Sequence, residues 1–175
     1  MPEILSAPQQ AMVDLFQKHV TAEMEGDIET TMATMTDNPH LNHVPVMAGG
    51  VGREGVRHFY ANHLVGKFFP ADVNMTTVSR TVGTSQIVEE LVISFTHDMV
   101  MDWLLPGVAP TGKPVIMALA VIVGFKDNKI SHEHIYWDQA GVLVQIGLFD
   151  PGDLPVCGAE SARKVLDPSL PARIM

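Results

Sequence analysis

Polar side chains alternate along one short segment in the C-terminal third of the chain. His132, His134, Tyr136 and Asp138 occupy every second position, and alternate residues of a β-strand project from the same face. Imidazole, phenol and carboxyl groups on one face could bind a polar group of a ligand and move a proton to or from it. The same side chains could instead satisfy one another's hydrogen bonds inside a core.

The residues before this segment should supply a facing wall. Val115 to Phe125 is apolar and rich in β-branched residues, and Ile130 to Gln139 reads as a second strand. The four residues between these segments, 126–129, suit the turn of a β-hairpin. If Lys126 faces Lys129, three cross-strand pairs follow, which are Asp138 with Met117, Tyr136 with Leu119, and His134 with Val121. The polar face would then lie against an apolar wall.

A second set of candidates falls in residues 86–105, which we expect to form one long strand. His97 and Trp103 share one face of this strand with apolar side chains, namely Leu91, Ile93, Phe95, Met99 and Met101. Asp98 and Asp102 share the other face, which solvent or a partner could cover. We therefore expect the His97 face to line the interior.

Metal and cofactor chemistry have less support. His132 and His134 could ligate a metal together with His40 or His43, but Gln139 stands near the position where a further Glu ligand would be needed, and the chain has a single cysteine, Cys157. The sequence has no nucleophile elbow of the Gly-x-Ser-x-Gly type, no Gly-x-Gly-x-x-Gly and no P-loop. We expect neither a metal nor a cofactor.

The elements that must position these residues are helices first and strands afterwards. Residues 6–25 carry apolar side chains at helical spacing, and Asp27 begins a second helix. Residues 52–65 form a third, whereas Pro and Gly make 40–52 irregular. Strands at 74–84 and 86–105 and the hairpin follow, and short helices are expected at 140–148 and 159–165. This order indicates the α+β class.

Composition limits the partners. The chain has 175 residues, of which 46% are hydrophobic, and a net charge of −9. An acidic protein repels phosphate backbones and anionic lipid, so we expect neither a nucleic-acid nor a membrane partner. The lone cysteine suits a reducing compartment and the first residues do not read as a secretory signal, which together favour a cytoplasmic protein.

Short motifs in the C-terminal half resemble a known group. The ordered set resembles the SnoaL-like polyketide cyclase group of the nuclear-transport-factor-2-like (NTF2-like) superfamily over roughly residues 10–150. The motifs are residues 95–98 (Phe-Thr-His-Asp), 105–107 (Leu-Pro-Gly), 110–113 (Pro-Thr-Gly-Lys), 127–130, the 133–138 strand and 143–147 (Leu-Val-Gln-Ile-Gly).

The resemblance implies a cone-shaped α+β barrel in which three N-terminal helices pack on a strongly curved antiparallel sheet around one pocket. It implies one domain over 1–175, with residues 151–175 as a C-terminal extension, and a homodimer through the sheet. The acid/base role of the group would fall on Asp138. His43 and Tyr60 would lie at the pocket mouth.

Together these features predict an enzyme that moves a proton on an apolar carbonyl compound, such as a cyclase, isomerase or lyase. Asp138 would be the base, assisted by His134, with His97 or Tyr136 holding the oxyanion. The expected ligand-binding residues are His43, Tyr60, Trp103, Met117, Leu119 and Tyr136. Two alternatives remain open: a hydrolase that activates water toward a small ester, lactone or epoxide, and a ligand-binding dimer without chemistry.

Overall fold

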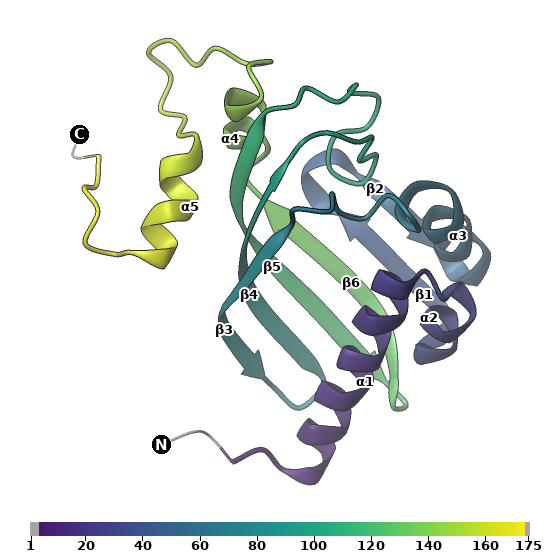
Figure 1. Cartoon of the computed structure of the whole chain (residues 1–175). Helices are drawn as coiled ribbons and strands as arrows, with labels where there is room; N and C mark the ends of the chain where they lie inside the picture. Colours follow the sequence, from purple (N-terminus) through teal and green to yellow (C-terminus); the bar gives the residue numbers. More distant parts are fainter. Residues whose placement is uncertain (1–3, 174–175) are drawn as a thin grey trace.

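A strongly curved six-stranded sheet forms the body of the molecule (Figure 1). The computed structural model describes residues 4–173. The strand order in the sheet is β2-β1-β6-β5-β4-β3. The strands are β1 (Met35–His43), β2 (Ala48–Val51), β3 (Asn74–Val82), β4 (Gln86–Thr96), β5 (Pro114–Lys126) and β6 (Lys129–Trp137). Helices and strands both contribute, which confirms the predicted α+β class.

Three helices cover the concave side of the sheet, as predicted: α1 (Ala7–Glu25), α2 (Ile28–Thr34) and α3 (Gly52–Phe59). The chain continues from α3 as a π-helical turn over Tyr60–Leu64. Two short helices follow the sheet, α4 (Gln139–Gln145) and α5 (Ala159–Leu166), and α5 lies on the side of the sheet opposite α1. Within residues 4–173, no helix is both long and apolar enough to cross a membrane.

Local signals fix both ends of α1. The amide and hydroxyl of Ser6 donate to the side-chain oxygen of Gln9, at 2.9 and 2.8 Å, which ties the first turn down. Gly26 ends the helix with a left-handed φ of 75°. Asp27 then caps α2 by accepting a hydrogen bond from the Thr30 amide at 3.0 Å. The sequence predicted these boundaries, and the structure confirms them.

The β5–β6 hairpin forms around the predicted turn, but its register changes within two residues. Asp127 and Asn128 both have positive φ (52° and 56°), as a two-residue hairpin turn requires, and Lys126 pairs with Lys129. After the Phe125–Ile130 pair, Gly124 pairs with His132, which leaves Ser131 as a bulge. The observed pairs beyond it are Leu119 with Trp137, Ala120 with Tyr136, and Ile122 with His134.

The three predicted cross-strand pairs are therefore wrong. These pairs are Asp138 with Met117, Tyr136 with Leu119, and His134 with Val121. One extra residue in the bulge shifts every later partner by one position.

Two further expectations are corrected by long-range pairing. Residues 40–52 are not irregular, because β1 pairs in parallel with β6 and antiparallel with β2. Residues 86–105 are not one strand, because β4 ends at Thr96 and a turn-rich segment follows. The first of these differences matters most, because it places β1 beside β6 and brings the N-terminal helices over the centre of the sheet.

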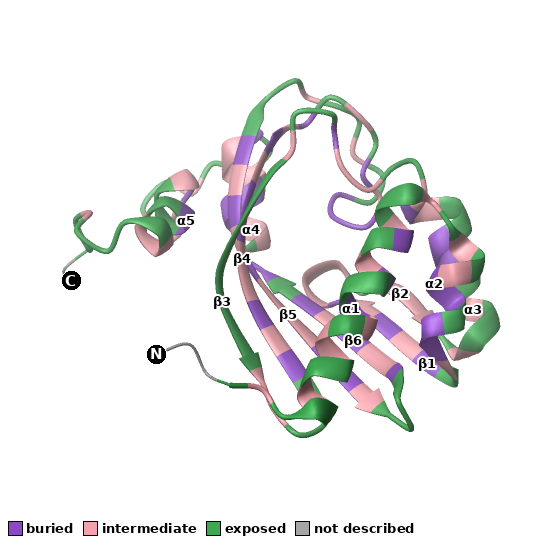
Figure 2. Ribbon diagram, turned by 60° about the horizontal axis from the view of Figure 1, so that its bottom comes forward, coloured by how far each residue is buried: buried purple, intermediate pink, exposed green. Residues whose placement is uncertain are grey.

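The face of β6 that points to the interior is the opposite of the one predicted. Glu133, Ile135 and Trp137 are buried on the concave side, whereas Tyr136 on the convex side is 42% exposed. Buried and less buried residues alternate along the strands of the sheet (Figure 2). Burying isoleucine and tryptophan side chains releases roughly 2–3 kcal/mol each, and this outweighs the hydrogen-bonding value of histidine and tyrosine at alternate positions. Glu133 lies on the same side of β6 as Ile135 and Trp137, so its side chain also points to the interior.

Candidate active site

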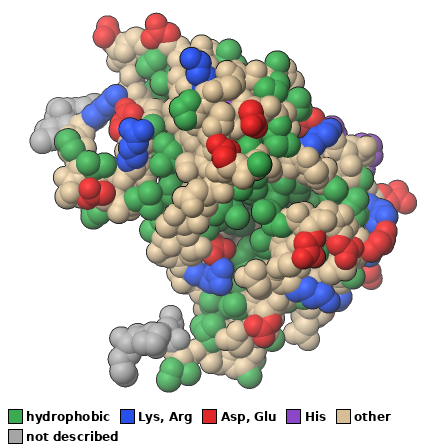
Figure 3. All heavy atoms as spheres, in the orientation of Figure 1, with side chains coloured by type: hydrophobic (Ala, Val, Ile, Leu, Met, Phe, Trp, Pro, Cys, Tyr) green, Lys and Arg blue, Asp and Glu red, His purple; other side chains and the backbone are tan. Residues whose placement is uncertain are grey.

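A cavity of about 280 Å³ lies between α1 and the concave face of the sheet. Figure 3 shows it as a hollow with hydrophobic walls on this face of the molecule. Its size lies at the lower end of the range for small-molecule sites. The apolar lining comes from Phe16, Val20, Met24, Leu41, Leu64, Phe68, Phe69, Met75, Leu91, Ile93, Trp103, Leu119, Val121 and Ile135. Polar lining residues are few: Gln17, Glu23, His43, Thr77, Arg80, Glu89 and Glu133.

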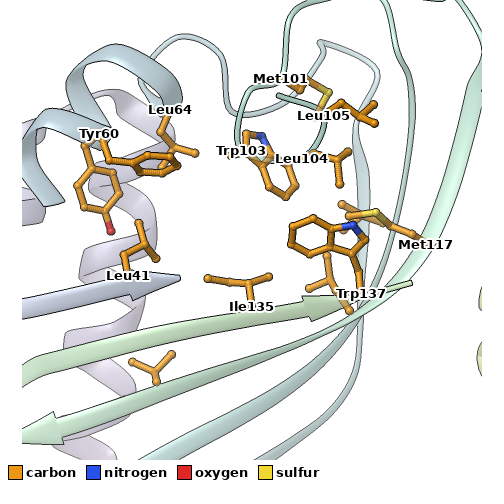
Figure 4. Packing of buried hydrophobic residues seen from close by; sticks show 14 of the residues in the cluster. Leu41, Tyr60, Leu64, Met101, Trp103, Leu104, Leu105, Met117, Ile135 and Trp137 are labelled. Atoms are coloured by element: carbon orange, nitrogen blue, oxygen red, sulfur yellow. The ribbon is translucent and has the colours of Figure 1, made fainter. Parts of the chain in front are cut away.

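Aromatic side chains close one end of the cavity. Trp103, from the segment after β4, lies over Trp137 from β6, with ring centroids 5.9 Å apart and an interplanar angle of 76° (Figure 4). The Trp103 ring nitrogen donates to the Phe68 carbonyl at 2.8 Å, so this polar atom is satisfied although the side chain is buried. The edge-to-face packing gives the cavity a rigid apolar end.

Buried ionisable groups meet at a second point on the cavity wall. His19 of α1 places Nε2 3.2 Å from a carboxylate oxygen of Glu133 and 3.2 Å from one of Glu23. The hydroxyl of Tyr60 donates to the same Glu133 oxygen at 3.1 Å. Side-chain exposure is 0% for His19, 9% for Glu23 and 6% for Glu133. We call these four residues the buried acid cluster.

A hydrogen-bond chain behind His19 sets its protonation. Thr34 donates its hydroxyl proton to the Thr31 carbonyl, so its oxygen is left to accept from Nδ1 of His19, 2.6 Å away. Nδ1 therefore carries a proton. Because Nε2 faces two carboxyl groups, it needs a proton as well, and the ring is an imidazolium. This assignment follows from the partners of each nitrogen.

The two carboxyl groups in the cluster differ in protonation. Burial alone would lower the pKa of His19, but Glu133 and Glu23 raise it well above the usual value. Burial would raise the pKa of Glu133, yet the His19 charge and the Tyr60 hydroxyl lower it below the usual value. Burial raises the pKa of Glu23, and His19 offsets this only in part. The cluster thus holds a carboxylate at Glu133 and a more proton-retaining carboxyl at Glu23.

His43 on the same wall is a neutral hydrogen-bond acceptor. Its Nδ1 lies 3.2 Å from the Ala48 carbonyl and donates to it, which leaves Nε2 unprotonated. Burial lowers the pKa of His43 to about 4. The ring packs between Phe59 and Trp103, with centroid distances of 5.4 and 5.3 Å. His43 adds a polar edge to the cavity without adding charge at neutral pH.

Four of the six predicted ligand-binding residues lie at or beside the cavity. His43, Trp103 and Leu119 line it, and Tyr60 stands behind its wall within the buried acid cluster. Met117 is buried in the core and does not line this cavity. Tyr136 projects from the convex face instead of the interior.

The three predicted catalytic residues lie in three separate places, none of them on the cavity wall. His134 is on the convex face, with Nε2 3.1 Å from Nε2 of His40. Asp138 caps α4 by accepting from the Gly141 amide at 3.0 Å. His97 is buried at the end of β4, with Nδ1 3.1 Å from the Thr111 hydroxyl. Their catalytic roles remain untested predictions, but the geometry does not bring them together.

Sequence reasoning missed three members of the buried acid cluster, although signals existed. His19 and Glu23 are four residues apart on the core-facing side of α1, so an ionisable pair interrupts an apolar stripe. Glu133 alternates with Ile135 and Trp137 in β6. A carboxyl group at core-facing spacing is costly to bury without a partner and therefore indicates one.

Comparisons with known proteins agree on the architecture. No protein-family model matches the sequence, and no curated protein matches it. Solved structures do match. A putative SnoaL-like polyketide cyclase from Jannaschia sp. CCS1 superposes with a TM-score of 0.66 at 16% identity, over 85% of this chain and 99% of that one. IdmH, a putative polyketide cyclase from Streptomyces antibioticus, superposes with a TM-score of 0.57 at 22% identity, over 78% of this chain and 98% of that one.

An NTF2-like protein of unknown function from Burkholderia xenovorans LB400 also superposes, with a TM-score of 0.53 at 16% identity, over 76% of this chain and 87% of that one. The fold is NTF2-like. This confirms the SnoaL-like, NTF2-like resemblance and the cone-shaped α+β architecture at the level of the fold. An NTF2-like fold hosts several activities, so function has to be argued from the residues of the cavity.

Proposed function

We propose that the protein binds an apolar carbonyl compound in the cavity and catalyses proton transfer on it, with Glu133 as general base and Glu23 as general acid. The observation that carries the proposal is that both carboxyl groups line one cavity while their surroundings shift their pKa values in opposite directions. Pairs of this kind mark the acid and the base of a site. The reaction class is that of an isomerase, cyclase or lyase.

Each member of the buried acid cluster has a role in this proposal. The His19 imidazolium and the Tyr60 hydroxyl keep Glu133 ionised and hold it in position. Burial raises the pKa of Tyr60 well above its usual value, and Glu133 and Glu23 raise it further, so the phenol stays a hydrogen-bond donor. Glu23 would protonate the oxygen that gains charge as Glu133 removes a proton from the neighbouring carbon.

Deuterium exchange tests the proposal even before the product has been identified. A panel of bicyclic ketones is incubated with the protein in D2O, and mass spectrometry follows deuterium uptake and new products. We expect exchange with wild type, and a fall of roughly 100-fold or more in Glu133→Gln. Glu90→Gln is the matched control, because Glu90 bonds Ser79 at 3.0 Å and does not line the cavity. Equal exchange in wild type and Glu133→Gln would rule out Glu133 as the base.

The same panel separates the other function classes. A lactone and an epoxide are included in water enriched in oxygen-18. Oxygen-18 in the product would show that water has been added, and would assign Glu133 and Glu23 to water activation instead. Saturable binding of a ketone with neither exchange nor product would make the protein a ligand-binding module.

We also propose, from the resemblance, that the protein is a homodimer through the convex face of the sheet. In support, the outward residues of β5 form a half-buried apolar strip of Ala118, Ala120 and Ile122 in the middle of that face. Light scattering with size exclusion tests this. Twice the chain mass is expected for wild type and one chain mass for Ala120→Arg, whereas a monomeric wild type would contradict the proposal.

A further inference from the structure

A second polar pair lies on the cavity wall, across the sheet from the buried acid cluster. Arg80 of β3 donates to a carboxylate oxygen of Glu89 of β4 at 2.6 Å. The Arg80 side chain is 32% exposed and that of Glu89 is 7% exposed, so the pair spans the cavity rim and its interior. Both residues line the cavity, as does Thr77 beside them. The proposed acid/base chemistry uses none of the three.

The pair keeps hydrogen-bonding capacity for a ligand. A guanidinium group has five N–H donors, and within residues 4–173 the Arg80 side chain makes only the bond to Glu89. One Glu89 oxygen, Oε1, accepts from both Arg80 and the Thr77 hydroxyl, the latter at 3.4 Å. The other oxygen has no protein partner among the described residues. Since the two charges cancel, the pair offers a donor and an acceptor without net charge.

We propose that Arg80 and Glu89 bind a hydroxyl group of the ligand, so that the substrate is an elongated apolar compound with a carbonyl at one end and a hydroxyl at the other. A hydroxyl both accepts and donates, which matches a guanidinium beside a carboxylate. A free carboxylate would instead be repelled by Glu89. This inference rests on the proposed function for the carbonyl end only.

Sheet register gives the separation of the two polar ends. Ile135, Val121, Glu89 and Arg80 form one row across four strands, and Glu133 lies two residues from this row on β6. Two strand spacings and two residues along a strand separate Glu133 from Glu89, which corresponds to about 10–12 Å between backbones. The wall between them is apolar, with Val121 and Ile135. A rigid two-ring or three-ring skeleton spans that distance.

Two fluorescent naphthalenes test the subsite by binding alone. 6-Acetyl-2-naphthol carries a carbonyl and a hydroxyl at opposite ends, whereas 2-acetylnaphthalene lacks the hydroxyl. We expect wild type to bind the naphthol roughly tenfold more tightly. In the double variant Arg80→Met/Glu89→Leu, which leaves no unpaired buried charge, the preference should fall below about twofold. Arg80→Met alone serves if the double variant does not fold, because its side chain is at the rim.

Arg57→Met is the matched control, since the Arg57–Glu29 ion pair is on the surface and neither residue lines the cavity. It should keep the wild-type preference. An equal affinity of wild type for the two naphthalenes, or a preference that survives loss of Arg80, would overturn the hydroxyl subsite. Turnover is not needed for this measurement. Failure of the deuterium-exchange test would therefore reject the acid/base proposal, and failure here would reject only the hydroxyl subsite.

Discussion

Nε2 of His19 lies 3.2 Å from the carboxylate of Glu133, although 114 positions separate the two residues in the sequence. Neither charge is tolerable at that depth without the other, because a lone buried ion loses its hydration without compensation. The pair therefore links α1 to β6 as well as setting the protonation of the site.

Loss of His19 should destabilise the protein strongly. In His19→Leu, Glu133 and Glu23 lose their cationic partner while they stay buried, and breaking a buried pair costs about 3–5 kcal/mol. Urea unfolding at pH 7 measures the change. Arg57→Ala removes an exposed ion pair with Glu29 and should cost less than about 1 kcal/mol. Similar losses in the two variants would contradict a buried ionic link.

Mild acid should destabilise the fold through His43. The pKa of His43 is about 4 in the folded protein against 6.5 ordinarily. The unfolded chain therefore binds more protons between these values, and the free energy of unfolding falls as the pH falls from 6.5 toward 4. The full effect is about 3 kcal/mol. Unfolding curves at several pH values should show a smaller acid loss in His43→Phe, and identical pH dependence would contradict the assignment.

His19 acts in the opposite direction. Its folded pKa is raised, so its contribution to stability is complete below the unfolded value of 6.5 and is lost as the pH rises through the folded value. In His19→Leu this loss on the alkaline side should disappear. An unchanged alkaline limb in the same unfolding series would show that His19 is not an imidazolium.

A comparison of Asp138→Asn with Glu133→Gln separates the two candidates for the base. Asparagine caps helices as well as aspartate does, so α4 should remain intact. We expect Asp138→Asn to keep deuterium exchange within about twofold of wild type, because its carboxylate accepts from the Gly141 amide. A large loss in Asp138→Asn with full activity in Glu133→Gln would return the role to Asp138.

Gly124 and His132 should show energetic coupling. A Cβ at Gly124 would lie 2.0 Å from the His132 ring, which stacks on His40 at 4.9 Å with an 8° interplanar angle. Gly124→Ala must therefore displace the ring, at a cost of about 1–3 kcal/mol. The double variant Gly124→Ala/His132→Ala should recover much of that loss in thermal unfolding. Strictly additive effects would mean that the ring moves away freely.

The parts of the fold that could be predicted from sequence are those with local causes. Ser6 and Gly26 mark the two ends of α1, because helix capping depends on neighbouring residues. Asp127-Asn128 indicated the hairpin turn, because few residue pairs accept positive φ at both positions. The parallel partner of β1 was not predictable in this way. β1 pairs with β6, which lies far away in the chain, and its own residues look like a loop.

The site was harder to predict because it depends on which alternate set of β6 side chains points to the interior. Ser131 forms a bulge although β6 itself contains no glycine, and the polar side chains at alternate β6 positions favoured the wrong face of the strand. The burial of Ile135 and Trp137 decided the orientation. Glu133 therefore points into the cavity because Ile135 and Trp137, at alternate positions of the same strand, are buried. Its partner His19 lies in α1, the first helix of the chain.

The parallel pairing of β1 with β6 also governs when the sheet can be completed during synthesis of the chain. Until residues 129–137 have been made, β1 has no central neighbour, and α1 has no Glu133 for its imidazolium. Such distant contacts form late and make folding slow. A ribosome-bound chain that stops before β6 should therefore leave one edge of β1 without a strand partner, and an unpaired strand edge can pair with other chains.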